Sequence, residues 1–161
     1  MEKTKKEIVT MHRIASLIPL SLDGKRLRQE TVSAVVLLQI ELADLVQQMV
    51  DAVQKAGEKA KPEGYDGRAP KEGEPESEER AKERADYEAS LAGIESRILE
   101  EKTALSRQLL TRDEFADICG LIGVEGEISI GAETDSATGE QRDMTYPRRM
   151  LIADIGRWLV A

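Results

Sequence analysis

The sequence predicts a mainly all-α fold: a helical bundle built on a long two-helix hairpin, with a small C-terminal β-hairpin and a terminal helix. Two observations support this prediction. Only 3% of the 161 residues are aromatic, so the core has to be built from aliphatic side chains, which suits helix-on-helix packing. Two long segments also repeat apolar residues at helical spacing, on either side of a stretch rich in proline and glycine. A chain of this length fits a single domain, residues 1–161.

The first predicted element is a short amphipathic helix over residues 5–18. Its apolar side chains recur at helical spacing, at Ile8, Met11, Ile14, Ala15 and Ile18. Pro19 ends it, because the residue before a proline avoids the helical conformation. We expect this helix to dock on the body of the protein; a basic helix that binds a membrane surface or a partner is the alternative.

The strongest pattern predicts a helix over residues 31–56 that ends at Gly57. Its apolar seam alternates steps of three and four residues, as in a coiled coil: Val35, Leu38, Leu42, Leu45, Met49, Ala52 and Ala56. More apolar side chains flank this seam on both sides, so one partner helix cannot cover the whole face. Helices from the termini can cover part of this face, and another subunit is the simplest cover for the rest. The sequence therefore predicts a homo-oligomer, with an interface that includes Val36, Val46, Val50 and Val53.

A mobile connector is predicted over residues 57–76, which contain three prolines and four glycines. A second long helix follows over residues 77–110, with Ser77 at its N-terminus. Its narrower apolar stripe consists of Tyr87, Leu91, Ile94, Ile98, Leu105 and Leu109. Charged residues occupy the rest of this helix and are typical of a solvated face. Antiparallel packing of the two long helices is favoured, and a flexible connector of about twenty residues also permits a parallel return.

Residues 111–161 are predicted to form a C-terminal cap. Thr111 and Glu114 have the spacing of a capping box, which begins a short helix that we expect to end at Gly120. The stretches EISIGAE and QRDMTY flank a turn and are predicted to form a β-hairpin. Pro147 then opens a terminal helix.

Charge and composition exclude several classes of function. The net charge of −8 is uneven, since residues 1–30 carry +3 and the rest of the chain carries −11. An acidic body repels phosphate, so we expect no nucleic-acid binding. Charges interrupt every candidate for the run of about twenty apolar residues that crosses a membrane, so no integral membrane segment is expected. Cys119 is the sole cysteine, and a cytoplasmic location is the default.

Few residues suit catalysis or metal binding. His12 is the only histidine, so neither a histidine-rich zinc site nor a hydrolytic triad is expected. Carboxylates do gather on one side of the helix over 31–56, where Glu41, Asp44 and Asp51 are candidate ligands for Mg²⁺. We expect them instead to form a solvated stripe opposite the seam, with no catalytic, cofactor or metal site.

The fragment ELADL, residues 41–45, is similar to the Glu-x-x-Asp motif of the all-α nucleotide pyrophosphohydrolases. The resemblance implies a bundle that gathers carboxylates from two helices around magnesium and a nucleoside triphosphate. The family pattern also includes a Glu-x-x-Glu motif on the preceding helix. There this chain offers only Glu7, beside Lys5 and Lys6.

The sequence therefore predicts a non-enzymatic structural or assembly protein that acts as a homo-oligomer, and leaves further protein partners open. A component of a phage particle or of a secretion apparatus fits this small acidic chain, so the phage particle is a second location beside the cytoplasm. The alternative function is a magnesium-dependent all-α nucleotide pyrophosphohydrolase.

Overall fold

The structure is a computed structural model that describes residues 1–65, 71 and 73–161. It is mainly helical, at 57%. The described helices are α1 (Lys5–Ser16), α2 (Gln29–Ala60), α3 (Glu78–Glu100), α4 (Arg112–Ile122) and α5 (Arg148–Trp158). The described strands are β1 (Glu2–Thr4), β2 (Ser21–Leu22), β3 (Lys25–Arg26), β4 (Lys102–Ala104), β5 (Glu127–Thr134) and β6 (Gln141–Pro147). They pair antiparallel as β1 with β4, β2 with β3 and β5 with β6.

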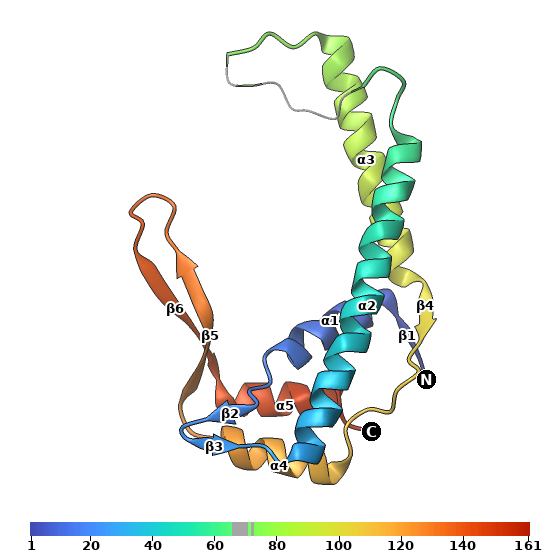
Figure 1. Cartoon of the computed structure of the whole chain (residues 1–161). Coiled ribbons are helices and arrows are strands. Elements are labelled where there is room, and N and C mark those ends of the chain that lie inside the picture. The colour runs from blue at the N-terminus through green and yellow to red at the C-terminus, as the bar shows by residue number, and fades with distance from the viewer. Residues whose placement is uncertain (66–70, 72) are drawn as a thin grey trace.

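Two parts project from a helical base (Figure 1). The base consists of α1, α4, α5 and the N-terminal half of α2. The C-terminal half of α2 and the antiparallel α3 form an arm, and the β5–β6 hairpin projects separately from the other side of the base. The predicted fold class, a helical bundle on a long two-helix hairpin with a C-terminal β-hairpin and a terminal helix, is confirmed.

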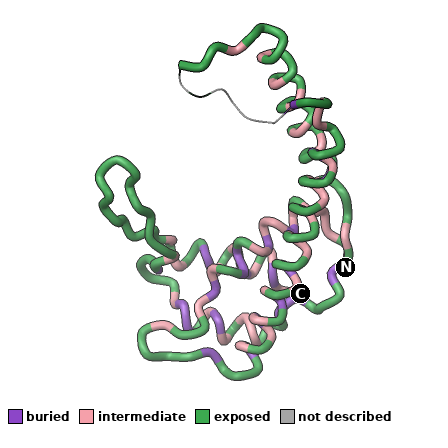
Figure 2. Tube along the Cα trace, turned by 45° about the horizontal axis from the view of Figure 1, so that its top comes forward, coloured by how far each residue is buried: buried purple, intermediate pink, exposed green. Residues whose placement is uncertain are grey.

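The hydrophobic core lies in the base, where the buried residues gather (Figure 2). The side chains that are at most 1% exposed include Met11, Val35, Leu42, Leu110, Ile118, Ile122, Leu151, Ile155 and Leu159. They are aliphatic, as the low aromatic content predicts. The arm is covered far less, since α3 buries only Ile98.

Helix α1 matches the prediction closely and ends at Ser16, shortly before Pro19. A capping box that the sequence analysis missed begins it. The Glu7 backbone N–H donates to Thr4 Oγ1 at 3.2 Å, and the Thr4 backbone N–H donates to Glu7 Oε2 at 2.8 Å. These bonds satisfy two backbone donors that the helix itself leaves unpaired.

Helix α2 has 32 residues and extends beyond the predicted 31–56. The prediction that Gly57 ends it is wrong. Gly57 is buried inside the helix, where an added Cβ would lie 2.8 Å from Leu91 Cδ2 and where the Tyr87 hydroxyl donates to the Gly57 carbonyl oxygen at 3.2 Å. Glycine here allows α3 to approach closely. The helix ends instead just before Pro62.

Helix α3 is shorter than the predicted 77–110, because residues 101–110 form an extended strap. Within the strap β4 pairs with β1, and the Leu105 N–H donates to the Met1 carbonyl oxygen at 2.9 Å. These backbone hydrogen bonds replace those of the predicted helix. Leu105 and Leu109 were predicted to lie on the helical stripe. They lie in the strap instead, where their side chains are buried.

The connector predicted over residues 57–76 is described only in part. Residues 57–60 are helical, and residues 66–70 and 72 lie outside the described residues. Tyr65 is 8% exposed, and its ring meets the Tyr87 ring edge to face, with centroids 5.4 Å apart. Through this aromatic pair, Tyr65 of the predicted connector packs against α3.

The C-terminal cap contains the predicted elements. Thr111 and Glu114 form the capping box of α4, with hydrogen bonds of 2.8 and 3.2 Å. The predicted end at Gly120 is wrong, because α4 continues to Ile122. Gly123 caps it, at a φ of 72° that favours glycine. The predicted β5–β6 hairpin follows, with Gly139 at a φ of 70° in its turn.

Replacing Ile155 by alanine is expected to lower the free energy of unfolding by about 2–5 kcal/mol, because its side chain is fully buried and leaves a cavity. Met150→Ala on the same helix is the matched control. Met150 is 54% exposed, so its replacement should change the free energy by less than about 0.5 kcal/mol. Urea denaturation followed by circular dichroism measures both variants, and equal losses would contradict the described core.

Candidate functional site

Helix α2 buries one face in the base and exposes another face to solvent. Val35, Leu38 and Leu42 are at most 2% exposed. Beyond them α3 packs along only one side of α2. Large apolar side chains on the uncovered side of α2 face solvent both beside the base and in the arm: Leu37 is 39% exposed, Ile40 53% and Val50 46%.

Of the four valines predicted at an interface, Val50 is exposed and Val36, Val46 and Val53 are half-buried. Val36 lines a shallow groove between α1 and α2, next to Ile40. Val50 is exposed on the same side of α2. Val46 is half-buried and packs against the core of the base, and Val53 is half-buried in the arm. Val50 is thus the one exposed valine of the four, and Val36 borders solvent along the groove.

Six uncharged residues on this side of α2 define a surface that we call the outer stripe: Val36, Ile40, Ala43, Gln47, Val50 and Gln54. They follow one another at steps of four and three residues, so they share one face of the helix. Ala43, Gln47 and Gln54 are exposed as well. Val36 and Val50 were predicted at an interface, but the stripe as a whole was not, because its glutamines interrupt the apolar pattern.

Glu41, which was expected to be solvated, is bound by the strap. Its Oε1 accepts hydrogen bonds from the Ser106 N–H at 2.7 Å and the Ser106 hydroxyl at 2.6 Å, and its Oε2 accepts one from the Arg107 N–H at 3.1 Å. Burial acts to raise the pKa of this carboxyl. The hydrogen bonds and the Arg107 charge outweigh burial, so the pKa lies below its ordinary value. No local sequence signal identifies a partner 65 residues away.

Asp44 and Asp51, the other candidate magnesium ligands, are exposed, as a solvated stripe requires. Asp51 accepts a hydrogen bond from Gln47 Nε2 at 2.9 Å. Glu41 is turned toward the strap, with both oxygens engaged. Among the described residues, no three His, Cys, Asp or Glu side chains form a group that could hold a metal ion. The structure thus does not bring the three candidates together.

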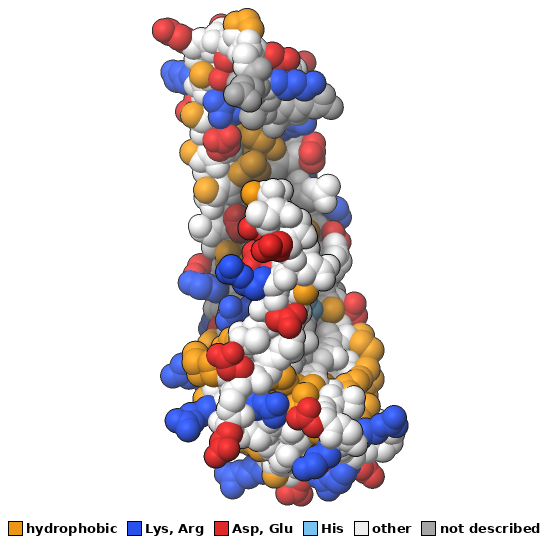
Figure 3. Space-filling view, turned by 90° about the vertical axis from the view of Figure 1, so that its left-hand side faces the viewer, with side chains coloured by type: hydrophobic (Ala, Val, Ile, Leu, Met, Phe, Trp, Pro, Cys, Tyr) orange, Lys and Arg blue, Asp and Glu red, His pale blue; other side chains and the backbone are white. Residues whose placement is uncertain are grey.

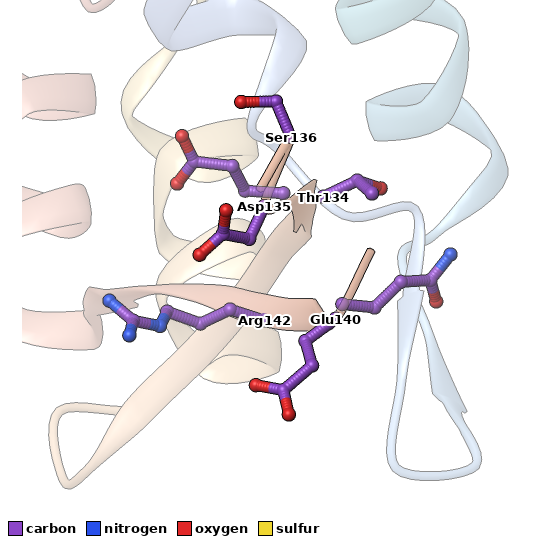
Figure 4. A pocket seen from close by; sticks show the side chains of 7 residues that line it. Thr134, Asp135, Ser136, Glu140 and Arg142 are labelled. Atoms are coloured by element: carbon purple, nitrogen blue, oxygen red, sulfur yellow. The ribbon is translucent and has the colours of Figure 1, made fainter. Parts of the chain in front are cut away.

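A hollow of about 450 Å³ lies at the tip of the β5–β6 hairpin (Figure 4). Its lining is polar and consists of Glu133, Thr134, Asp135, Ser136, Glu140, Gln141 and Arg142. The labelled side chains point in different directions rather than toward a common centre. Asp135 Oδ1 accepts the Ala137 N–H at 2.8 Å, within the turn itself. The hollow is therefore the open side of a hairpin turn.

The surface carries a mixture of charges, with acidic and basic side chains interspersed over the face in Figure 3. Helix α2 is the one helix among the described residues that is long and apolar enough to cross a membrane, by length and composition alone. Only 17% of its most apolar 18-residue window is buried. Because α2 packs on α1 and α3, the same composition fits a helix that pairs with another protein. The absence of an integral membrane segment stays a prediction.

Comparison with known proteins assigns no family: no family model matches the chain, and neither the curated proteins nor the solved structures show a significant match. Functional inference therefore rests on the geometry of the described residues.

Replacing Glu41 by glutamine is expected to lower the free energy of unfolding by about 1–3 kcal/mol at pH 7, because an uncharged amide cannot accept all three hydrogen bonds. Folding lowers the pKa of Glu41, so its carboxylate stabilises the fold above the unfolded-state pKa. That contribution is lost as the pH falls through the folded-state pKa. The difference in the free energy of unfolding between wild type and variant should thus be fully present at pH 7. It should decrease as the pH falls below 4.5, the ordinary pKa of this carboxyl.

Asp44→Asn is the control for this prediction. Asp44 is exposed on the same helix, so its replacement should change the free energy of unfolding by less than about 0.5 kcal/mol at either pH. Chemical denaturation at neutral and at acid pH provides the measurement. Equal effects of the two substitutions would show that Glu41 does not hold the strap.

Proposed function

We propose that the protein is a non-enzymatic structural or assembly protein that acts as a homo-oligomer. The observation that carries this proposal is the exposure of apolar side chains along α2, above all Ile40 at 53% and Val50 at 46%. Burying a large aliphatic side chain contributes about 1.5–3 kcal/mol relative to leaving it in water. A row of such side chains on a projecting helix is typical of a protein–protein contact.

The described elements leave this row uncovered. Helix α1 meets α2 near the base, α3 packs along another side of α2, and the β5–β6 hairpin stands apart from the arm (Figure 1). A neighbouring copy of the chain presents the same exposed apolar side chains, over the same length of helix. It is therefore the partner that we propose for the outer stripe.

An assembly of many copies, such as a phage particle or a secretion apparatus, is the setting that we propose, in the cytoplasm or within the particle. The shape of the chain supports this setting, because the arm and the hairpin project from the base and extend the reach of each subunit. Further protein partners belong to the same proposal.

The alternative from the sequence, a magnesium-dependent nucleotide pyrophosphohydrolase, has less support. Glu41 would have to release Ser106 and Arg107 before it bound a magnesium ion. A direct test is magnesium-dependent release of pyrophosphate from a panel of nucleoside triphosphates. Activity that is abolished by Asp44→Asn would replace the function proposed above.

Light scattering coupled to size exclusion is expected to report a dimer or larger species at micromolar concentration. Ile40→Glu combined with Val50→Glu should shift the protein toward the monomer, since each substitution places a charge where apolar side chains would meet. The control is Val124→Glu, because Val124 is 58% exposed but lies in the loop after α4. It should leave the mass unchanged. A well-folded wild-type monomer at high concentration would refute the proposed function.

A further inference from the structure

We infer that the outer stripe pairs with the outer stripe of a second copy, in a parallel and in-register coiled coil. The inference rests on the proposed homo-oligomer and adds the surface, orientation and register of the contact. It depends on the spacing of the stripe, on its two glutamines and on the charges beside it.

The spacing of the outer stripe is that of a coiled-coil core. Its residues form two sets with a period of seven: Ile40, Gln47 and Gln54 in one, and Val36, Ala43 and Val50 in the other. The first set occupies the a positions of a heptad and the second occupies the d positions. From Val36 to Gln54 the stripe is about 27 Å long, given the helical rise per residue. A second helix is the partner that matches such a stripe along its length.

The glutamines indicate the orientation of that helix. In a parallel pair each a residue faces its own counterpart, whereas in an antiparallel pair a residues face d residues. Parallel pairing sets Gln47 and Gln54 against their counterparts, and an amide both donates and accepts. Antiparallel pairing sets them against Val36, Ala43 or Val50 and leaves the amides unpaired, which is costly. In the single chain Gln47 donates to Asp51, and its carbonyl oxygen has no partner among the described residues.

The charges beside the stripe favour the same orientation. One rim, at the e positions, begins with Leu37 and then carries three acidic side chains, Asp44, Asp51 and Glu58. The other rim, at the g positions, is uncharged and contains Gln39, Val46 and Val53. Parallel helices place the acidic rim of one copy against the uncharged rim of the other. Antiparallel helices place two acidic rims together, and like charges repel.

The polar groups also favour a protein partner over lipid. Gln47 and Gln54 would carry unsatisfied amides into hydrocarbon, and Asp44 and Asp51 flank them as charges. A second copy satisfies the amides and leaves the carboxylates at the edge of the contact, in water.

Single-cysteine variants test the register. Gln47→Cys and Gln54→Cys, each combined with Cys119→Ser, place one thiol per chain in two successive a layers. With oxidised glutathione as the oxidant, each variant is expected to form a disulfide-linked dimer, as two thiols are oxidised and the glutathione is reduced. The two positions lie about 10 Å apart along the helix, so an antiparallel pair brings at most one of them next to its counterpart.

Gln48→Cys in the same background is the matched control, because Gln48 is exposed on α2 but lies outside the stripe. Circular dichroism verifies that each variant is folded. Links at 47 and 54 but not at 48 support the inference, and any other pattern overturns it. If the protein is oligomeric but forms neither link, the proposed function stands and the surface is wrong. A monomer would remove both proposals, and a monomer that binds phosphatidylcholine vesicles would assign the stripe to lipid.

A charge pair at position 47 gives a second test without disulfides. Gln47→Glu and Gln47→Lys should each weaken self-association by about tenfold, since like charges then face each other. An equimolar mixture should restore wild-type affinity in sedimentation equilibrium, because in-register parallel helices set the opposite charges face to face. A mixture that associates no better than either variant alone would overturn the parallel register.

Discussion

Burial of one side of α2 organises the whole chain. Val35, Leu38 and Leu42 are almost fully enclosed, and the base closes around them. Aliphatic side chains supply this core, so the elements have to meet as helix on helix rather than around large aromatic rings. Apolar side chains occupy more of the surface of α2 than the neighbouring helices of the same chain cover. One segment of sequence thus closes the base and leaves large apolar side chains such as Ile40 and Val50 exposed to solvent.

The strap, residues 101–110, shows how an extended segment can be held without a broad sheet. β1 pairs with its first part, and Glu41 of α2 binds its middle. At its end, the Leu110 N–H donates to the Leu159 carbonyl oxygen at 2.8 Å, and the Ala161 N–H donates to the Leu110 carbonyl oxygen at 3.0 Å. Three distant parts of the chain thereby satisfy the backbone groups of one segment. The strap also fixes where α3 ends and where α4 begins.

Local patterns predicted the elements better than their ends. Periodicity located α1, α2 and the hairpin, and capping chemistry located the start of α4. Gly57 was misassigned because a glycine near the end of an apolar pattern usually marks a helix end, whereas here it admits the Leu91 and Tyr87 side chains. The strand β4 and the partners of Glu41 depend on contacts distant in the sequence, which no local rule contains. Apolar character predicted Val36 and Val50 at the candidate interface. Gln47 and Gln54 of the outer stripe were recognised only from their exposure on the same side of the helix.

The arm has a mechanical consequence. From Leu42 to its end at Ala60, α2 extends about 27 Å beyond the buried core, and it is braced by α3 through half-buried contacts. A rotation of about 15° at the base, of the size seen between subunits of allosteric proteins, would move the tip by about 7 Å. The arm is thus a lever that enlarges small movements of the base. If the arms of two subunits pair along their length, they bend together. A rotation of one base then also displaces the tip of the neighbouring arm.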